Sequence, residues 1–525
     1  MKRLSFICFL ILFSSLTFGQ FTQYADGPVF PDPGPGFAKI IQLKDYSTMF
    51  IHVSLTKGLF IHVYEPVNKA RTETKIEPAY GSIQQGNVEG IFEVNGDAVV
   101  MVSKTANDQT NLYRLIIDGK TGKLKEEKQV ASVKKALIKK GNARSVSLPE
   151  LSVRKDPNSD AYAVALFGAD TSKRIEVILY GADNKEISRS AYTGNGKYKY
   201  LQYIDMVVTG NDKVAMLLYG YDIDAKNEKT GELILAGMDR SAGNLTLTEL
   251  DYSNDLLLEN GITRYDPQTK QILLLSTAKV KSESYELNTY LGFIDPVGKK
   301  LLTNTAISPG ENFEKKYTAF FGRKATYSGT PQNLLLNKDG TYTVLFEELE
   351  TVKEKDTASH SLLHNTTVVT YDKEAQPVNA WLVPMDQYVP GSLPAFYQSA
   401  MEISGQQFSN NSEFKSAAYI SDGHNSFVVF NDKESNLQTV ADGKLTQFKD
   451  LKDADAFYSQ LSGNDIIISK RQYVFGKPVV VTGETEHKLA LVNVFSYDPV
   501  NNIFVLLKQD KEPGHPGYKL VWLQP

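Results

Sequence analysis

The stretch from Leu112 to Gly122, which reads LYRLIIDGKTG, is the pattern that decides the fold. A short apolar run of strand-forming residues meets an Asp and a Gly-containing turn, after which a second strand begins. An Asp at such a turn bonds its own backbone two residues on, and Gly supplies the positive φ that the hairpin needs. We therefore predict that Asp118 is a structural residue rather than a functional one.

This strand–Asp–turn pattern returns along the chain at a regular spacing. Successive turn aspartates are 65, 56, 56 and 77 residues apart, and the intervals leave room for two further strands. Four antiparallel strands per unit is the composition of a β-propeller blade. Counting gives seven such units and three terminal strands, hence eight blades, or seven if the terminal strands share one blade. The turn aspartates are Asp118, Asp183, Asp239, Asp295 and Asp372.

The predicted fold class is all-β, a single β-propeller domain over residues 38–525. A chain of 525 residues is too long for one ordinary core, and a ring of repeats resolves this because each blade packs only against its neighbours. The alternative is two β-sandwich domains in series. Sandwiches would show a linker near the middle of the chain, and residues 193–307 contain none.

The turn Asp118–Gly122 resembles the blade turns of quinoprotein-type propellers, with Lys125–Lys128 where those repeats carry a Trp. Trp381 and Trp522 are the only tryptophans, which argues against WD-repeat and sialidase-type blades. In architecture the chain resembles exported bacterial β-propeller proteins of poorly characterised families. That resemblance implies the fold and transfers no functional residue.

The N-terminus has the pattern of a signal peptide over residues 1–19, with Lys2 and Arg3 before an apolar run that is too short to span a bilayer. Cys8, the only cysteine, lies inside that run, so the processed chain has no thiol. Residues 20–37, rich in Pro and Gly, are predicted to be an extended tether without a strand ladder. We expect an exported protein, periplasmic or extracellular, with no transmembrane segment after processing.

Loop lengths differ between the two rims of the predicted ring. The turns that join first to second and third to fourth strands are short, and we call this side the short-turn rim. The connections on the other side, the long-loop rim, are long, and long insertions are where scaffolds usually place function. Residues 385–412 are the longest, and a short helix beginning at Pro394 is predicted to cap the channel.

Tyrosines lie among basic residues in one sector of the long-loop rim. Such a combination suits a sugar or a polyanionic glycan through stacking and charge. The candidate ligand-binding residues are Lys173, Arg174, Lys197, Tyr198, Lys199, Tyr200 and Tyr203.

Two histidines and one acidic loop are the candidates for metal sites. His52 and His62 lie in two copies of Phe-Ile-His-Val and are predicted to face one another across a hairpin, which would give half a metal site, although cross-strand packing is the competing interpretation. No cofactor is expected, apart from a possible structural Ca²⁺ in the loop 221–231. The acidic residues Glu347, Glu348, Glu350 and Glu354 are interpreted as solvated charge.

Two functions from different classes remain. The first is a noncatalytic propeller that binds a ligand or a protein on the long-loop rim. The alternative is an extracellular or periplasmic enzyme that acts on glycan or peptide at the channel mouth. The formal net charge of −4 argues against nucleic acid as a partner, which leaves a glycan, a peptide or a protein.

Overall fold

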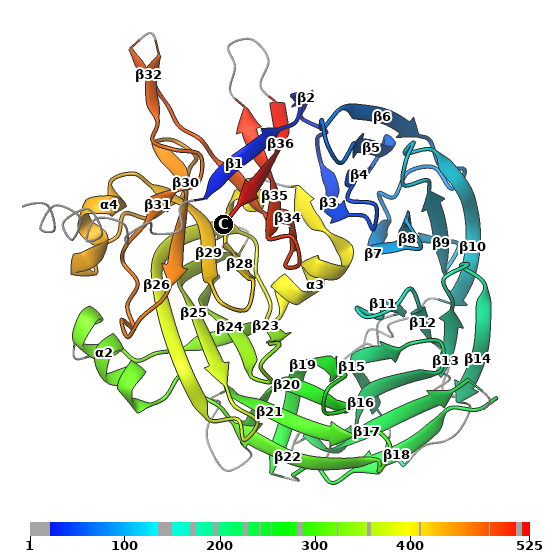
Figure 1. Ribbon diagram of the computed structural model, residues 1–525. Helices are drawn as coiled ribbons and strands as arrows, with labels where there is room; N and C mark the ends of the chain where they lie inside the picture. Colours follow the sequence, from blue (N-terminus) through cyan, green and yellow to red (C-terminus); the bar gives the residue numbers. More distant parts are fainter. Residues whose placement is uncertain are drawn as a thin grey trace, which may run out of the picture.

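The computed structural model describes residues 21–525 except for 135–149, 169–174, 193–196, 199, 224–228, 241–242, 254, 281–286, 323, 354–358, 409–410, 482 and 511–516. Eight antiparallel four-stranded blades form a ring, so the predicted β-propeller is confirmed (Figure 1). The signal-peptide prediction falls on residues outside the described range.

The blades follow one another along the chain, and each runs from an inner to an outer strand. Blade 1 is β3 (Gly36–Gln42), β4 (Thr48–Ser54), β5 (Gly58–Tyr64) and β6 (Arg71–Ile76); blade 2 is β7 (Gly86–Val94), β8 (Asp97–Ala106), β9 (Gln109–Ile117) and β10 (Leu124–Lys134); blade 3 is β11 (Leu151–Lys155), β12 (Tyr162–Phe167), β13 (Ile175–Tyr180) and β14 (Glu186–Tyr192); blade 4 is β15 (Tyr200–Thr209), β16 (Lys213–Ile223), β17 (Lys229–Asp239) and β18 (Thr246–Leu250).

The second half of the ring continues the order. Blade 5 is β19 (Leu256–Asp266), β20 (Gln271–Val280), β21 (Leu287–Asp295) and β22 (Lys300–Ala306); blade 6 is β23 (Gly329–Leu336), β24 (Tyr342–Val352), β25 (His360–Tyr371) and β26 (Pro377–Pro390); blade 7 is β28 (Ala417–Ser421), β29 (Ser426–Lys433), β30 (Ala454–Leu461) and β31 (Gln472–Tyr473); blade 8 is β34 (Ala490–Asp498), β35 (Ile503–Asp510), β36 (Gly517–Gln524) and β1 (Thr22–Asp26).

The turn aspartates hold their own turns, as the sequence predicts. Asp118 Oδ1 accepts from the backbone N–H of Thr121 at 2.8 Å, and Asp295 Oδ1 accepts from that of Val297 at 2.9 Å. Asp372 Oδ1 accepts from the N–H of Glu374 at 3.0 Å. In each turn the Asp carboxylate thus accepts from a backbone N–H that has no acceptor in the β-ladder.

The N-terminal segment closes the ring, and the predicted tether is wrong in this respect. β1 pairs antiparallel with β36, and Thr22 lies opposite Gln524; β2 (Phe30–Pro31) also pairs with β36. The prolines that disfavour a ladder begin at Pro28, and β1 contains none. The prediction used the composition of residues 20–37 as a whole, which hides the strand. The terminal strands do share one blade, and the total is still eight.

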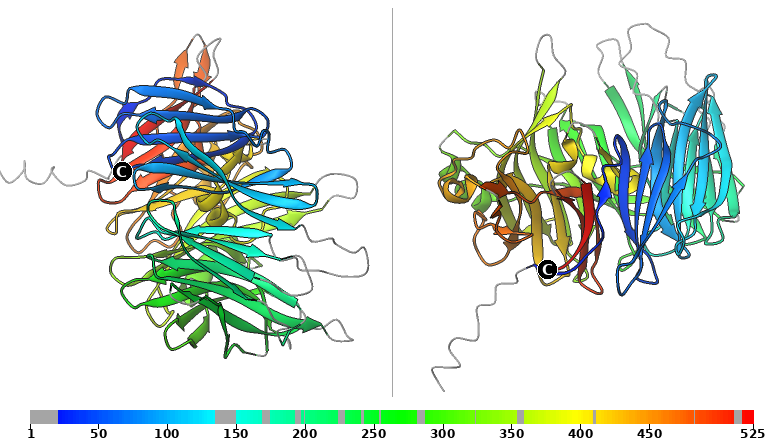
Figure 2. Two further views of the ribbon diagram at one scale, coloured as in Figure 1. Left: turned by 90° about the vertical axis from the view of Figure 1, so that its right-hand side faces the viewer. Right: turned by 90° about the horizontal axis from the view of Figure 1, so that it is seen from above.

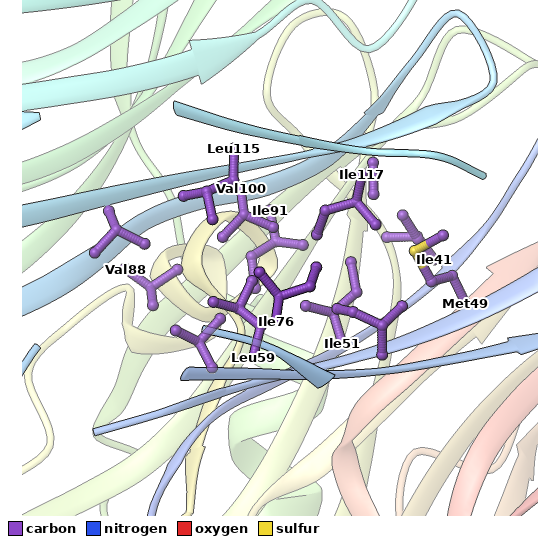
Figure 3. Close-up of a cluster of buried hydrophobic side chains, with 14 of the residues drawn as sticks. Ile41, Met49, Ile51, Leu59, Ile76, Val88, Ile91, Val100, Leu115 and Ile117 are labelled. Atoms are coloured by element: carbon purple, nitrogen blue, oxygen red, sulfur yellow. The ribbon is translucent and has the colours of Figure 1, made fainter. Parts of the chain in front are cut away.

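The core lies between neighbouring blades rather than at the centre of the ring. Figure 3 shows the layer between blades 1 and 2, where Ile51 and Leu59 of one sheet face Ile91, Val100 and Leu115 of the next. All five side chains are fully buried. Each blade thus covers one apolar face of the next, and closure leaves no blade without a partner.

The connections that contain helices all lie on the long-loop rim. They carry α2 (Glu311–Phe321), α3 (Tyr397–Ser404) and α4 (Asn436–Thr439) with the short 3₁₀ turns η1 (Ser412–Phe414) and η2 (Val440–Asp442). The last connection forms a hairpin of β32 (Val479–Val481) and β33 (Glu484–Glu486). α2 precedes blade 6, whose first strand begins at Gly329. Within the described residues no helix combines the length and the apolar composition needed to cross a membrane.

Candidate functional site

The central channel holds a cavity of about 750 Å³. Its walls are the last residues of the inner strands of blades 1, 2, 3, 6, 7 and 8, together with α3. Inner strands run from the long-loop rim to the short-turn rim, so the cavity occupies the half of the channel nearer the short turns. Exposed turn residues complete its mouth on that side, namely Pro157, Lys338, Gly423 and Pro499.

The other end of the cavity is covered by the connection between blades 6 and 7. This segment enters the ring as α3 and then as β27 (Gln406–Phe408), which adds to the inner edge of blade 1, with Gln406 opposite Ala38. Figures 1 and 2 show α3 inside the ring of blades. Met401 and Glu402 of α3 face the cavity. The predicted helix that caps the channel is present, beginning three residues after Pro394.

A buried carboxylate anchors α3. Glu347 of β24 is 1% exposed and accepts hydrogen bonds from Tyr397 Oη at 2.5 Å, Gln398 Nε2 at 2.9 Å and Ser416 Oγ at 2.7 Å. Burial raises the pKa of Glu347 to about 7, because the desolvated charged form is only partly compensated by these donors. The backbone N–H of Ser416 in turn donates to Gln387 Oε1 at 2.6 Å.

Lys39, Lys155 and Glu402 on the cavity wall are engaged with neighbouring protein atoms. Lys39 Nζ donates to the carbonyl of Ile91 at 2.7 Å and to that of Glu402, and burial lowers the pKa of Lys39 to about 8. Glu402 Oε1 accepts from Asn333 Nδ2 at 2.7 Å. Lys155 Nζ donates to the carbonyls of Asp156 and Ser159. These contacts fix the wall.

Aromatic side chains line the wall contributed by blades 7 and 8. Tyr419, Phe495 and Tyr497 are half-buried and border the cavity. Tyr497 Oη donates to Asn502 Oδ1 at 2.8 Å, and the Tyr419 hydroxyl lies 3.0 Å from Ser426 Oγ. With their hydroxyls held at the edge, the rings are fixed surfaces on which a planar or apolar group can stack.

The cavity lies nearer the short-turn rim, whereas loop length predicted a functional surface on the long-loop rim. We predicted that function lies on the long-loop rim, but the longest excursion folds into the channel and covers it from that side. Loop length alone gives no information about whether an insertion extends outward or inward. The channel is therefore accessible from the short-turn rim.

The candidate ligand-binding residues that the structure describes, Lys197, Tyr198, Tyr200 and Tyr203, differ in exposure and in partners. Lys197 is exposed and pairs with Glu249 at 3.1 Å, whereas Tyr198 is only 9% exposed and lies under the ammonium of Lys197. Tyr200 stacks on Tyr221, with ring centroids 5.3 Å apart. Tyr203 contacts Ser152 Oγ at 2.9 Å inside the ring. Lys173, Arg174 and Lys199 lie outside the described residues, as does the central part of the proposed calcium loop, 224–228.

The two histidines of the repeated Phe-Ile-His-Val motif do not face one another directly. His52 lies opposite Phe60, and His62 lies opposite Phe50, because the hairpin closes with Ser54 opposite Gly58. Both are buried, and desolvation lowers the pKa of His52 to about 4 and that of His62 to about 3. His62 packs edge-on against Phe30.

Sequence reasoning missed the role of Glu347, which was interpreted as solvated charge. Glu348 is likewise buried, at 5% exposure, and accepts from Tyr317 Oη of α2 at 2.8 Å. The one available signal is that both follow the apolar run 342–346 without a turn residue, so they continue a buried strand. Only the placement of α2 and α3 identifies their partners.

No protein-family model matches the chain, and no curated protein sequence matches it. Among solved structures, it is similar to a Synechocystis apocarotenoid oxygenase at 14% identity and a TM-score of 0.35, covering 68% of this chain and 73% of that one. It is also similar to a prolyl endopeptidase at 8% identity and a TM-score of 0.39, covering 91% of this chain and 55% of that one. Likenesses at this level assign neither a family nor an activity.

Proposed function

We propose that the protein is an exported binding propeller whose ligand enters the central cavity from the short-turn rim. The observation that carries the proposal is the cavity itself, which at about 750 Å³ has the size of a small-molecule or short-oligomer site. One wall is aromatic, and α3 forms a fixed floor. The signal-peptide pattern of residues 1–19 supports export to the periplasm or the exterior.

Binding fits the cavity better than acid–base catalysis does. A catalytic pair needs two titratable groups whose side chains are available to the substrate. Here Lys39 and Lys155 donate to backbone carbonyls, and Glu402 is held by Asn333 and Arg264. The rings of Tyr419 and Tyr497 remain as the main recognition elements.

The ligand class that suits this wall is a short glycan or an extended peptide. Sugar rings and apolar side chains both stack on tyrosine, while Asn337, Asn493 and Gln42 supply polar groups at the same surface.

Screening the processed protein against glycan and peptide arrays tests the proposal. A ligand found in this way is then titrated into the variants Tyr419→Ala and Tyr497→Ala, with Tyr46→Ala as the matched control. Tyr46 is 65% exposed on a neighbouring turn and does not line the cavity. We expect at least tenfold weaker binding for the two cavity variants and unchanged binding for the control. Equal binding by all three variants would exclude the cavity as the site.

An enzymatic function has one specific observation in its favour. Between blades 6 and 7, on the long-loop rim, a hollow of about 560 Å³ contains the imidazole of His364 between Glu350 and Asp386, each 3.7 Å from a ring nitrogen. Buried Glu348 lies in the same hollow. Hydrolysis of a labelled glycan or peptide that is lost in His364→Ala and kept in Tyr497→Ala would support this alternative.

A further inference from the structure

Three side chains able to bind a metal converge at blade 7, away from the cavity. Glu434 directly follows β29, Asp455 is the second residue of β30, and His487 precedes β34. The first two flank a long insertion, and the third ends the connection into blade 8. All three therefore lie on the long-loop rim.

The main chain holds these three residues in place. The N–H of Glu434 donates to the carbonyl of Asp453 at 3.0 Å, and the N–H of Ala456 donates to that of Lys488 at 2.8 Å. The N–H of Lys488 also donates to Asp455 Oδ1 at 2.7 Å. The two connections are thus fixed against each other before any ion binds.

The donor atoms lie at distances that suit one ion. A ligand atom from each of Glu434, Asp455 and His487 lies within 4.8 Å of the other two. His487 Nδ1 is 2.8 Å from Asp455 Oδ2, and Tyr473 Oη donates to Glu434 Oε1 at 3.0 Å, leaving its second oxygen available. Ligands of a tetrahedral Zn²⁺ lie about 3.4 Å apart, given metal–ligand distances near 2.1 Å. Binding an ion would therefore require the 2.8 Å contact between His487 Nδ1 and Asp455 Oδ2 to open and the wider separations to close.

Two carboxylates and one imidazole make up the cluster, an arrangement that a bound cation would stabilise. Asp455 is 1% exposed, and within the described part of the chain its ion-pair partner is His487, while Glu434 has no Lys or Arg within 4.0 Å. Neighbouring Lys433 is engaged with Asp450 at 2.6 Å, and Lys488 Nζ reaches the carbonyl of Phe475. Two carboxylates this close, one fully buried, repel each other unless a positive charge compensates them.

We propose that Glu434, Asp455 and His487 bind a divalent transition-metal ion of the Zn²⁺ class. An imidazole nitrogen with carboxylate oxygens suits Zn²⁺ rather than Ca²⁺, which prefers six or more oxygens. Water would complete the coordination, as in zinc sites that have three protein ligands. The ion links the 434–453 insertion to the connection that carries the β32–β33 hairpin.

Calorimetric titration of the tag-free processed protein tests the site. The protein is stripped with EDTA, dialysed, and titrated with ZnCl₂ and separately with CaCl₂. We expect one tight equivalent of Zn²⁺ and at least hundredfold weaker binding of Ca²⁺. In Glu434→Gln and His487→Ala the tight equivalent is expected to weaken at least tenfold. His424→Ala is the control, because His424 lies exposed on the short-turn rim.

Thermal unfolding provides a second readout that does not depend on calorimetry. A ligand that binds only the folded state raises Tm, so Zn²⁺ is expected to raise the Tm of the native protein and of His424→Ala but not that of Glu434→Gln. Circular dichroism verifies that Glu434→Gln, which keeps the side-chain shape, is folded. The proposal is overturned if the native protein binds no tight equivalent of Zn²⁺, or if folded Glu434→Gln and His487→Ala bind it as tightly as the control.

Discussion

The carboxylate of Glu347 accepts a hydrogen bond from the hydroxyl of Tyr397, with 2.5 Å between the oxygens. This contact joins the second strand of blade 6 to the helix that closes the channel. Since Gln398 and Ser416 donate to the same carboxylate, one side chain fixes both ends of the inserted segment. The floor of the cavity therefore depends on a group that titrates.

Glu347→Gln is expected to change how stability depends on pH. The pKa of Glu347 rises from 4.5 to about 7 on folding, so the folded state binds the extra proton between these values. The stabilisation that comes from this raised pKa is fully present below pH 4.5 and is lost as pH rises through 7. At about 1.4 kcal/mol per pKa unit, the native protein loses up to about 3 kcal/mol over this window. Urea unfolding at pH 5 and pH 8 measures it.

The variant is expected to lack this loss, because a glutamine does not titrate. Glu374→Gln is the control, since Glu374 is exposed on a turn of the same blade and the variant should leave the pH dependence unchanged. The same slope in the native protein and in Glu347→Gln would contradict the prediction.

Asp432→Asn is expected to destabilise the fold by about 3–5 kcal/mol, because it leaves the Arg471 guanidinium buried without its counter-charge. The two side chains form an ion pair in which each is 1% exposed, and Arg471 Nη2 also donates to the carbonyl of Pro384 at 2.6 Å. Glu249→Gln breaks the exposed pair with Lys197 and should cost less than about 1 kcal/mol. Comparable losses in the two variants, measured by chemical unfolding, would be inconsistent with this account.

Trp522→Ala is expected to cost about 3–5 kcal/mol by opening a cavity at the junction of blades 8 and 1. The Trp522 ring is 1% exposed, packs edge-on against Tyr64 at 5.3 Å, and donates from Nε1 to Thr48 Oγ1 at 3.1 Å. Trp381 is only partly buried, so Trp381→Ala should cost clearly less. Thermal unfolding compares the two tryptophans, and an equal Tm loss would argue against a special role for this junction.

Lys415→Met removes the hydrogen bonds from Lys415 Nζ to the carbonyls of Phe448 and Lys449, and its stability relative to the native protein is expected to be most favourable at neutral pH. Burial lowers the pKa of Lys415 from 10.5 to about 7, and its ammonium lies 3.3 Å from the Phe448 ring centroid. The folded state then disfavours the charged form, a penalty that is full below pH 7 and is lost as pH rises towards 10.5. The stability of the variant relative to the native protein should therefore fall by about 3 kcal/mol between pH 7 and pH 9.5. A relative stability that does not change with pH would contradict the lowered pKa.

The parts of the fold that depend on local chemistry were predictable from the sequence. Asp118 and Asp295 lie in turns whose hydrogen bonds are made within three residues, so their role is visible in any window that contains them. A short helix in the connection between blades 6 and 7 was also predicted, but α3 begins at Tyr397 rather than in the turn that contains Pro394.

The parts that were missed depend on contacts between distant residues. β1 is a strand because it pairs with residues 521–524, and no local pattern reveals that partner. Glu347 and Tyr397 are 50 residues apart, and Asp455 and His487 are 32 apart. The sequence does not give the contacts between distant elements. An acidic residue at the end of a strand therefore has the same local sequence pattern whether solvent or a helix covers it.

The pairing of Thr22 with Gln524 has a consequence for the order in which the molecule can be completed. During synthesis from the N-terminus, β1 emerges about five hundred residues before its partner, and its edge stays unmatched throughout translation. Bringing such distant segments together is slow, because the entropy cost of closing the loop arises before the stabilising contacts form. Closure of the ring by β1 and β36 therefore has to wait until β36 has been made.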